Sequence, residues 1–152
     1  MRVVAVVVSI LLPLGVVAAA RSAPSSGMVI KTAFNAKLKK AIVVDGSGRT
    51  VYMLMSDSAG KPTCAQLDPR CPSTWPAVPA KGSPVAGKGI DKKLLGVVKG
   101  ARGVSQVTYN HHPLYYFHGG SGYVGDKKPG DVNGQKFFSI WFVLTPKGAP
   151  IR

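Results

Sequence analysis

Short runs of apolar and β-branched residues, separated by turn-forming residues, cover most of the chain after residue 27. Alternation of apolar with polar or small residues predicts a first strand from Met28 to Phe34. The other expected strands span 41–44, 49–55, 104–109, 114–117 and 137–144. Turn signals at 45–48 and 110–113 join four of these strands into two β-hairpins. Because only 90–98 fits a helical turn as well as a strand, the pattern predicts an all-β fold.

The strand expected at 49–55 also predicts which side chains share a face. Successive residues of a strand point to opposite sides of the sheet. Val51, Met53 and Met55 therefore lie on one face, opposite Tyr52 and Leu54.

The second half of the chain repeats the first. Residues 43–54 match 107–117, and 75–78 match 141–144. Tyr52 precedes Trp75 by 23 residues, and Tyr115 precedes Trp141 by 26. Two copies are too few for a propeller or a solenoid. They favour one small antiparallel sandwich or closed sheet in which each hairpin–loop–Trp copy covers the other.

The repeats and the Pro/Gly-rich stretches divide the chain into segments. We expect a signal peptide at 1–20, a linker with the first strand at 21–36, a first repeat at 37–78, a basic Gly/Pro linker at 79–93, a second repeat at 94–147 and a tail at 148–152.

The first twenty residues have the pattern of a signal peptide. Arg2 supplies a positive charge, residues 3–17 are almost wholly apolar, and residues 18–20 are the small alanines that signal peptidase accepts. An apolar run of about 15 residues is short for a membrane span of ~20. We expect cleavage near Ala20, with Ala23 as the alternative site, and no transmembrane span after cleavage. A retained N-terminal anchor is the competing interpretation.

Export changes how Cys64 and Cys71 are interpreted. In an oxidising compartment a lone close pair of cysteines forms a disulfide. Closing a loop of this length stabilises the fold by roughly 2.5 kcal/mol in the chain-entropy model. The alternative is a redox-active or metal-binding pair, although six intervening residues do not match a Cys-x-x-Cys motif.

The composition restricts both the chemistry and the partners. The formal net charge is +14, or +13 after removal of residues 1–20, which include Arg2. All six acidic residues are aspartates, so no glutamate acts as acid or base. A surface of this charge favours anionic envelope or extracellular polymers, with affinity that falls as salt rises. No nucleic-acid-binding motif appears, so no specific nucleic acid is expected, and nothing specifies an oligomeric state.

Several of these segments resemble a family of bacterial secreted repeats. The string from Val43 to Tyr52, followed by Cys64, Cys71 and Trp75, resembles one repeat. The segments 94–96, 106–110, 113–117 and 128–135 resemble a second. The family comprises predicted lipoproteins with a Tyr-x-(Phe/Trp/Tyr)-x-x-Asp motif and no assigned function. The resemblance covers about residues 37–147 and implies secretion or envelope attachment without implying a reaction.

Each copy departs from the motif of that family. The first copy has Leu54 at the aromatic position and keeps Asp57. The second keeps Phe117 and lacks the aspartate, for which Asp126 is the expected replacement after a glycine-rich insertion at 119–125. No cysteine follows the signal segment, so the lipid anchor usual in the family has no attachment residue here.

The recurring residues are the first candidate site. They are either core, with tyrosine hydroxyls bonded to a backbone or aspartate partner, or an aromatic platform of the kind that binds glycans or cofactors. The aspartates either cap loops or contact a ligand. The candidate ligand-binding residues are Tyr52, Asp57, Trp75, Tyr115, Phe117, Asp131 and Trp141.

Methionine and histidine form a second candidate site. Thioether and imidazole ligands together suit copper, which is the one cofactor the sequence suggests. Methionine is also a common core filler, and adjacent histidines in a strand point in opposite directions. The candidate metal ligands are Met53, Met55, His111, His112 and His118.

Neither a nucleophile motif nor a phosphate-binding loop is present, so we expect no enzyme activity. The sequence favours a secreted, non-enzymatic envelope or extracellular binding protein whose ligand is unassigned. The alternatives are a periplasmic copper-binding or electron-transfer accessory protein and, third, a small enzyme with an unrecognised site.

Overall fold

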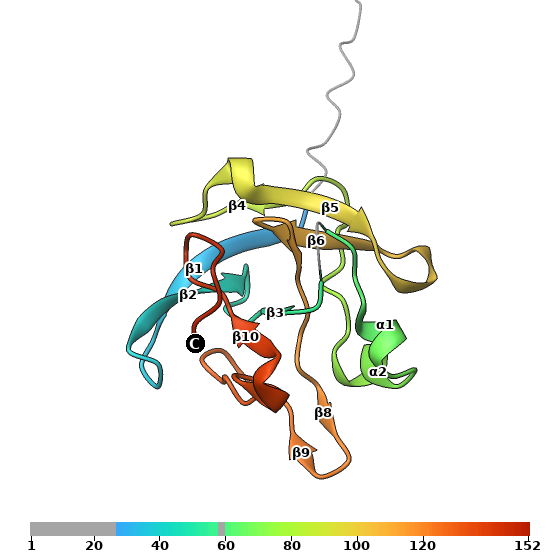
Figure 1. The fold of residues 1–152 in the computed structure, drawn as a ribbon. Helices are drawn as coiled ribbons and strands as arrows, with labels where there is room; N and C mark the ends of the chain where they lie inside the picture. The colour runs from blue at the N-terminus through green and yellow to red at the C-terminus, as the bar shows by residue number, and fades with distance from the viewer. Residues whose placement is uncertain (1–26, 58–59) are drawn as a thin grey trace, which may run out of the picture.

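The computed structural model describes residues 27–57 and 60–152, so the predicted signal peptide at 1–20 lies outside the described residues. Strands predominate, as the sequence predicts, and the helical segments are single turns (Figure 1). The elements, with η for a 3-10 turn, are β1 (Val29–Asn35), β2 (Lys40–Asp45), β3 (Tyr52–Leu54), α1 (Cys64–Leu67), α2 (Cys71–Thr74), β4 (Val85–Ala86), η1 (Lys92–Leu94), β5 (Leu95–Lys99), η2 (Ala101–Gly103), β6 (Ser105–Tyr109), β7 (His112–Pro113), β8 (Gly119–Gly120), β9 (Tyr123–Val124), η3 (Phe137–Ser139) and β10 (Trp141–Val143).

The tyrosine segments of the two repeats pair with each other at the centre of the fold. The backbone N–H of Tyr52 donates to the carbonyl of Tyr115 at 2.9 Å, and Tyr115 returns the same bond at 2.9 Å. On its other side, each tyrosine segment pairs with the tryptophan segment of the opposite repeat. Tyr52 lies opposite Val143 of β10, and Tyr115 lies opposite Ala77. The tryptophan segment of each repeat therefore pairs with the tyrosine segment of the other repeat.

The outer strands continue the same symmetry. The N–H of Val43 in β2 donates to Leu144, and the N–H of Val107 in β6 donates to Val78, at 3.0 and 2.9 Å. β1 pairs with β2, and β5 pairs with β6, both antiparallel. The backbone pairings thus run β1, β2, β10, β3, 113–117, 75–78, β6 and β5 around an approximate two-fold axis between the central tyrosines.

The strands present alternate residues to two apolar cores. Tyr52 and Leu54 belong to one core, and Val51 and Met53 belong to the other, which confirms the predicted alternation. The all-β prediction is also confirmed. The described sheets are small and none of them closes, so the closed-sheet version of the prediction does not apply.

The structure corrects several local predictions. The hairpin expected at 41–55 exists only around its turn, where Val44 bridges Thr50, because β3 leaves to pair with β10. The strand expected at 137–144 begins only at Trp141, after the turn η3. The stretch 90–98 contains both a helical turn, η1, and most of β5. The first repeat contains the helical turns α1 and α2, and the linker expected at 79–93 contains β4, which pairs in parallel with β1.

Within the described residues, the helices are all too short to cross a membrane.

Candidate functional site

The tyrosine of each repeat donates a hydrogen bond to an aspartate of the other. Tyr52 Oη lies 2.6 Å from Asp126 Oδ2, and Tyr115 Oη lies 2.8 Å from Asp57 Oδ2. The two aspartates also occupy equivalent places, because the N–H of Asp57 donates to Leu54 and that of Asp126 donates to Phe117. Asp126 therefore stands in the second repeat where Asp57 stands in the first.

Burial controls the ionisation of these two pairs. Loss of solvent raises the pKa of Asp57 and of Asp126 above the ordinary value, although their hydrogen bonds act in the opposite direction. Burial also raises the pKa of Tyr52 and Tyr115, and the neighbouring carboxylate reinforces the effect. Both tyrosines are therefore protonated donors at neutral pH. The remaining donors to the carboxylates come from Thr63, to Asp57, and from the backbone of Asn133, to Asp126.

The two tryptophans stack between the repeats. The rings of Trp75 and Trp141 lie 3.8 Å apart and 1° from parallel, and Phe117 packs on Trp75 with ring centres 4.3 Å apart. A Cβ at Gly134 would lie 2.7 Å from the Trp75 ring, so only glycine fits there without a shift. The five aromatic candidates of the sequence analysis are thus brought together, and each is at most 3% exposed: Tyr52, Trp75, Tyr115, Phe117 and Trp141.

The two aspartate candidates lie in different surroundings. Asp57 is buried against Tyr115, whereas Asp131 lies in a surface turn. Asp131 accepts hydrogen bonds from the backbone N–H groups of Lys127 and Lys128, and the Lys37 Nζ lies 3.9 Å from its carboxylate. Its geometry is that of a loop cap, and it makes no side-chain hydrogen bond to the aromatic cluster.

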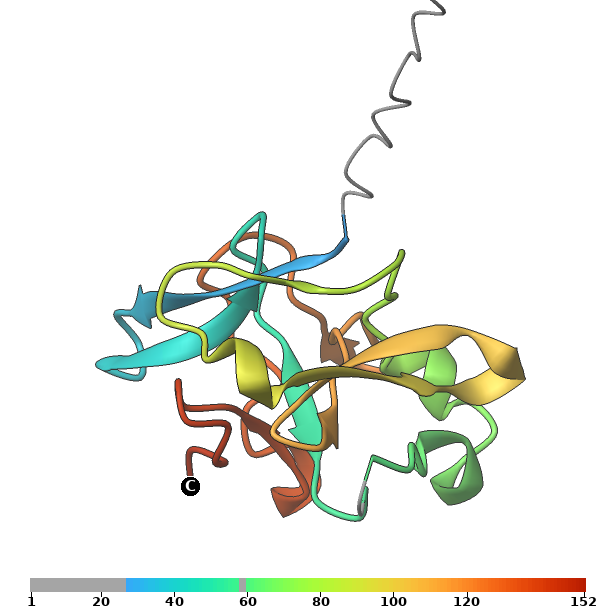
Figure 2. The ribbon, with the colours of Figure 1, turned by 90° about the horizontal axis from the view of Figure 1, so that it is seen from above.

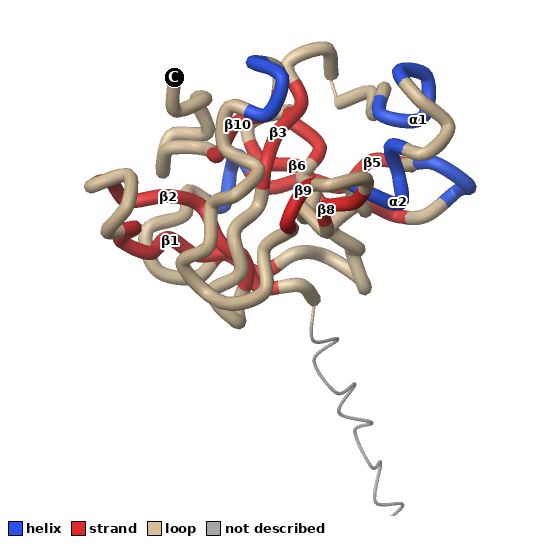
Figure 3. Tube along the Cα trace, turned by 90° about the horizontal axis from the view of Figure 1, so that it is seen from below, coloured by secondary structure: helices blue, strands red, loops and turns tan. Residues whose placement is uncertain are grey.

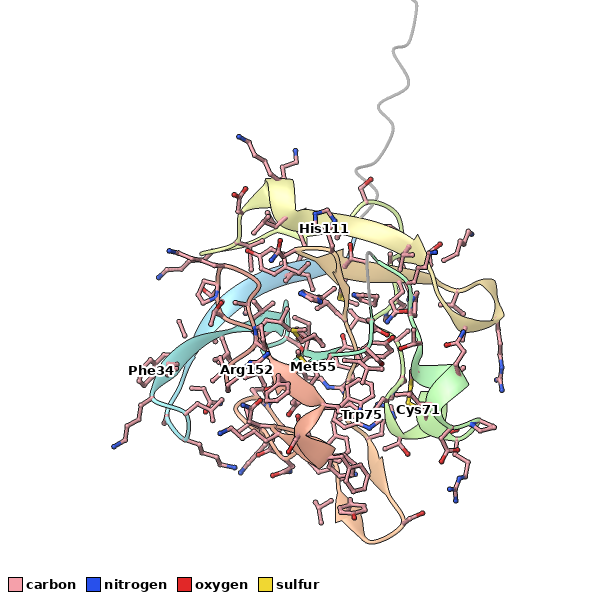
Figure 4. The ribbon with its side chains drawn as sticks, in the orientation of Figure 1. Phe34, Met55, Cys71, Trp75, His111 and Arg152 are labelled. Atoms are coloured by element: carbon pink, nitrogen blue, oxygen red, sulfur yellow. A yellow bond between two sulfur atoms is a disulfide. The ribbon has the colours of Figure 1, made fainter. Side chains whose placement is uncertain are left out.

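A groove with a volume of about 320 Å³ opens beside the stacked tryptophans. We call it the aromatic groove and define it by its ring-bearing residues Trp75, Tyr123, Phe137, Phe138 and Trp141. One wall is α1 and α2, and the other is β8, β9 and η3. Figures 1 and 3 show β8 and β9 side by side, and the Tyr123 ring of β9 packs on the Phe137 ring of η3. Figure 4 shows Trp75 beside Cys71, at the foot of the α2 wall. Tyr123 is 50% exposed and Phe138 is 71% exposed, so the groove offers aromatic faces to a ligand.

The aromatic rings connect the groove to the buried core. The Phe137 ring lies 5.6 Å from Trp75, 4.7 Å from Tyr123 and 4.5 Å from Phe138. Polar groups stand at the rim, where Arg70 Nη2 lies 3.0 Å from Asp68 Oδ2. An exposed ring with a carboxylate, a guanidinium and hydroxyls around it can stack on a flat ligand and bond to its polar edge.

One wall of the groove contains non-glycine residues with unfavourable backbone φ angles. Lys136, Phe138 and Ser139 have positive φ angles of 61°, 48° and 59°. Each such residue costs roughly 1–2 kcal/mol when it is not glycine. Strain of this kind concentrates at functional sites, where the surrounding structure maintains it. Here it turns the chain so that Phe138 projects into solvent instead of continuing strand β10 inward.

The other wall of the groove depends on the glycine-rich insertion. Phe117 is followed by Asp126 after nine positions, whereas Leu54 is followed by Asp57 after three. The six additional residues form the β8–β9 hairpin. A Cβ at Gly119, where φ is 73°, would lie 2.3 Å from the Gly125 backbone, so the base of this hairpin requires glycine.

A larger cleft, of about 440 Å³, lies on the other side of the disulfide loop between residues 62–77 and 99–106. Its aromatic lining residues, Trp75 and Tyr115, are buried. The Gln106 amide in its wall already donates to the Leu114 carbonyl at 2.9 Å. Unlike the aromatic groove, this cleft therefore presents no exposed aromatic face to a ligand.

The candidate copper ligands are spread over the molecule. Met53 is buried in a core, and Met55 is partly exposed. Figure 4 shows Met55 near the centre and His111 at the border formed by β5. The Nδ1 of His112 is buried without a hydrogen-bond partner, and burial lowers the pKa of His112 and His118. The described residues contain no group of three or more His, Cys, Asp or Glu side chains placed to hold a metal.

Sequence reasoning missed the exposed part of the groove. Arg70, Tyr123, Phe137 and Phe138 were not among the candidates, although all four line it. Two signals could have found them. Tyr123 lies inside the insertion that only the second repeat has, and two adjacent phenylalanines precede Trp141, where the first repeat has no aromatic residue before Trp75.

The fold and the groove define a class: a small all-β protein of two interlocked repeats with one disulfide, Cys64–Cys71, in the first repeat. The disulfide predicted from the sequence is therefore confirmed. A family model described as a secreted repeat of unknown function, Lipoprotein_15, matches residues 96–145, which cover nearly all of the second repeat. The match confirms the resemblance to this family. The comparisons with curated proteins and with solved structures gave no match.

Proposed function

We propose that this protein is a secreted, non-enzymatic binding protein and that the aromatic groove binds a glycan chain of the envelope or extracellular space. The match to a secreted-repeat family and the disulfide are those of an extracellular protein. Cleavage near Ala20 would release the mature chain on the outer side of the membrane.

The observation that carries the proposal is the exposed pair Tyr123 and Phe138 at the mouth of a groove. Phe138 is exposed by a turn in which it and its neighbours Lys136 and Ser139 have unfavourable positive φ angles. Sugar rings have an apolar face that stacks on aromatic side chains and a rim of hydroxyls that bonds to Asp68 and Arg70. The net charge, +13 after removal of residues 1–20, favours glycans that carry carboxylate or phosphate groups.

The test is a titration of the protein with anionic oligosaccharides, namely uronic-acid oligomers and phosphate-bearing cell-wall fragments. Both tryptophans of the chain line the groove, so their fluorescence should change on binding, and the groove variants assign that change to the groove. Phe138→Ala and Tyr123→Ala should each weaken binding about fivefold, which corresponds to about 1 kcal/mol per lost ring contact.

Phe34→Ala is the matched control, because Phe34 is 73% exposed and lies at the far end of β1 (Figure 4). It should leave binding unchanged. Equal affinity of the protein and both groove variants would place the glycan elsewhere and overturn the proposal, and so would an absence of binding to every glycan in the panel.

Copper binding is the second candidate function. The supporting observation is the buried Nδ1 of His112, which has no hydrogen-bond partner among the described residues. Neutral imidazole is the form that binds metals, and a lowered pKa keeps His112 neutral at physiological pH. Added copper should then raise the melting temperature of the protein, and His112→Gln should abolish the increase. Unchanged melting with copper would exclude this role.

A further inference from the structure

Strand β5 forms one end of the paired layer. On its outer edge, the Leu95 carbonyl and the Val97 N–H have no bonding partner in the part of the chain that the structure describes. Among the described residues, β5 pairs only with β6. Figure 1 shows it along the upper border of the molecule, and Figure 2 shows the same border from above. The N–H of Asn110 donates to Leu94, and the N–H of Gly100 donates to Val104. In an antiparallel pair such bonds alternate, so Leu95 and Val97 direct their backbone groups away from β6.

The same chain shows what this edge can bind, because β1 is the equivalent strand in the first repeat. Thr32 lies opposite Val43, and Val97 lies opposite Val107, in registers that the internal two-fold axis relates. The outer edge of β1 is occupied by an extended segment. Thr32 N–H donates to Lys88 at 2.8 Å, and Ile30 accepts from Gly87 at 2.7 Å. Val97 N–H and the Leu95 carbonyl are the corresponding donor and acceptor on β5.

The C-terminal segment, which follows the second repeat as 79–88 follow the first, does not reach β5. It folds back on β10 instead, where the N–H of Ile151 donates to Val143 at 2.9 Å. A shallow cleft of about 320 Å³ is lined by residues 93–98 together with Gly60, Thr108 and His111, and it lies over the face that β5 shares with β6. Val97 is 47% exposed there.

The charges around this edge select the partner. Lys92, Lys93, Lys99 and Arg102 are all exposed at its two ends. The nearby Asp91 carboxylate accepts from the N–H of Lys93 and so serves as a local cap. A second copy of the chain would bring two such basic edges together, whereas a segment with acidic side chains would neutralise them.

We propose that the outer edge of β5 binds an extended acidic segment of a partner protein, which adds to the layer as a further strand. Its backbone N–H donates to Leu95 O, and its carbonyl accepts from Val97 N–H, as 87–88 do on β1. Backbone bonds supply affinity in this mode of recognition, and the flanking lysines supply specificity. The site is separate from the aromatic groove, so it does not depend on the function proposed above.

The test is backbone amide NMR of the whole protein with three synthetic ten-residue peptides. One alternates valine or threonine with aspartate, one replaces aspartate by lysine, and one keeps the aspartates but has proline at every second position. The acidic β-forming peptide should shift and protect the Val97 amide, which should exchange freely before it is added. The proline peptide, with equal charge and too few donors, should bind at least tenfold more weakly.

Charge reversal provides the matched variants. The double variant K93E/K99E should lose the acidic peptide and bind the lysine peptide, while K127E/K147E, with the same change in net charge on exposed sites elsewhere, should behave as the unmodified protein does. Three results would overturn the proposal: a Val97 amide already as protected as that of Thr32, equal binding of the acidic and proline peptides, or equal effects of the two double variants.

Discussion

The two repeats are alike in their buried residues and differ in their outer loops. Inside, the repeats match closely: Tyr52 with Asp126 mirrors Tyr115 with Asp57, and Trp75 stacks on Trp141. Outside, they differ, because only the first repeat has the disulfide helices and only the second has the β8–β9 hairpin. The shared residues hold the repeats together, and the unshared loops form the walls of the aromatic groove. Repeated residues in this chain therefore form the scaffold, and unrepeated ones form the surface that we propose binds a ligand.

Removal of either tryptophan should have the largest effect on stability, and it tests whether the shared residues hold the repeats together. Trp75→Ala or Trp141→Ala leaves a cavity between the repeats, and each should lower the free energy of unfolding by about 3–5 kcal/mol. Urea denaturation measures the loss. Phe138→Ala, on the exposed wall, should change stability by no more than about 0.5 kcal/mol. A small loss of stability in either tryptophan variant would show that the stacked tryptophans do not hold the two repeats together.

The disulfide tests the unshared wall of the first repeat. Replacing both cysteines by serine should cost about 2.5 kcal/mol, because the short loop gains freedom in the unfolded chain. The groove should also lose affinity, since Cys71 and α2 form part of its wall. Thermal unfolding and the oligosaccharide titration measure the two effects. If the double serine variant binds the glycan with full affinity, the disulfide loop does not contribute to the groove.

The tyrosine hydroxyls test the shared pairs. Tyr52→Phe and Tyr115→Phe each remove a hydrogen bond to a buried carboxylate, and each should cost about 2 kcal/mol in chemical denaturation. Similar losses would support the symmetry of the two pairs. Tyr123→Phe is the control, because the Tyr123 hydroxyl lies at the exposed groove and should contribute almost nothing to stability. A large difference between the two buried variants would contradict the equivalence of Asp57 and Asp126.

Local pattern predicted the strands better than their partners. Alternation placed Tyr52 and Leu54 on one face, as the structure has them. It could not show that β3 pairs with β10, because a strand's side-chain pattern specifies a face and leaves the neighbouring strand open. It also extended the last strand back to Phe137, since phenylalanine favours strands and nothing local reveals that the backbone of Phe138 is left-handed. Repetition drew attention to the buried aromatic residues, whereas the groove depends on an insertion.

The smallest expected effect is on the pH dependence of stability, to which Asp57 and Asp131 should contribute with opposite signs. Burial raises the pKa of Asp57, so the native state holds its proton more tightly than the unfolded chain does. The stability contributed by this group is then full below the unfolded value of 3.8 and is lost as pH rises through the raised pKa. The backbone N–H of Lys127 lowers the pKa of Asp131, whose contribution is full above 3.8 and is lost as pH falls through the lowered pKa.

The measurement is the free energy of unfolding of the protein, Asp57→Asn and Asp131→Asn between about pH 2 and pH 7. The advantage of the unmodified protein over Asp57→Asn should shrink as pH rises, while its advantage over Asp131→Asn should grow. The two slopes separate a carboxylate enclosed between the repeats from one that caps a surface turn. If both differences change in the same direction, Asp57 is not enclosed in solution, and the interlocked Tyr–Asp pairs do not hold the repeats together as the structure indicates.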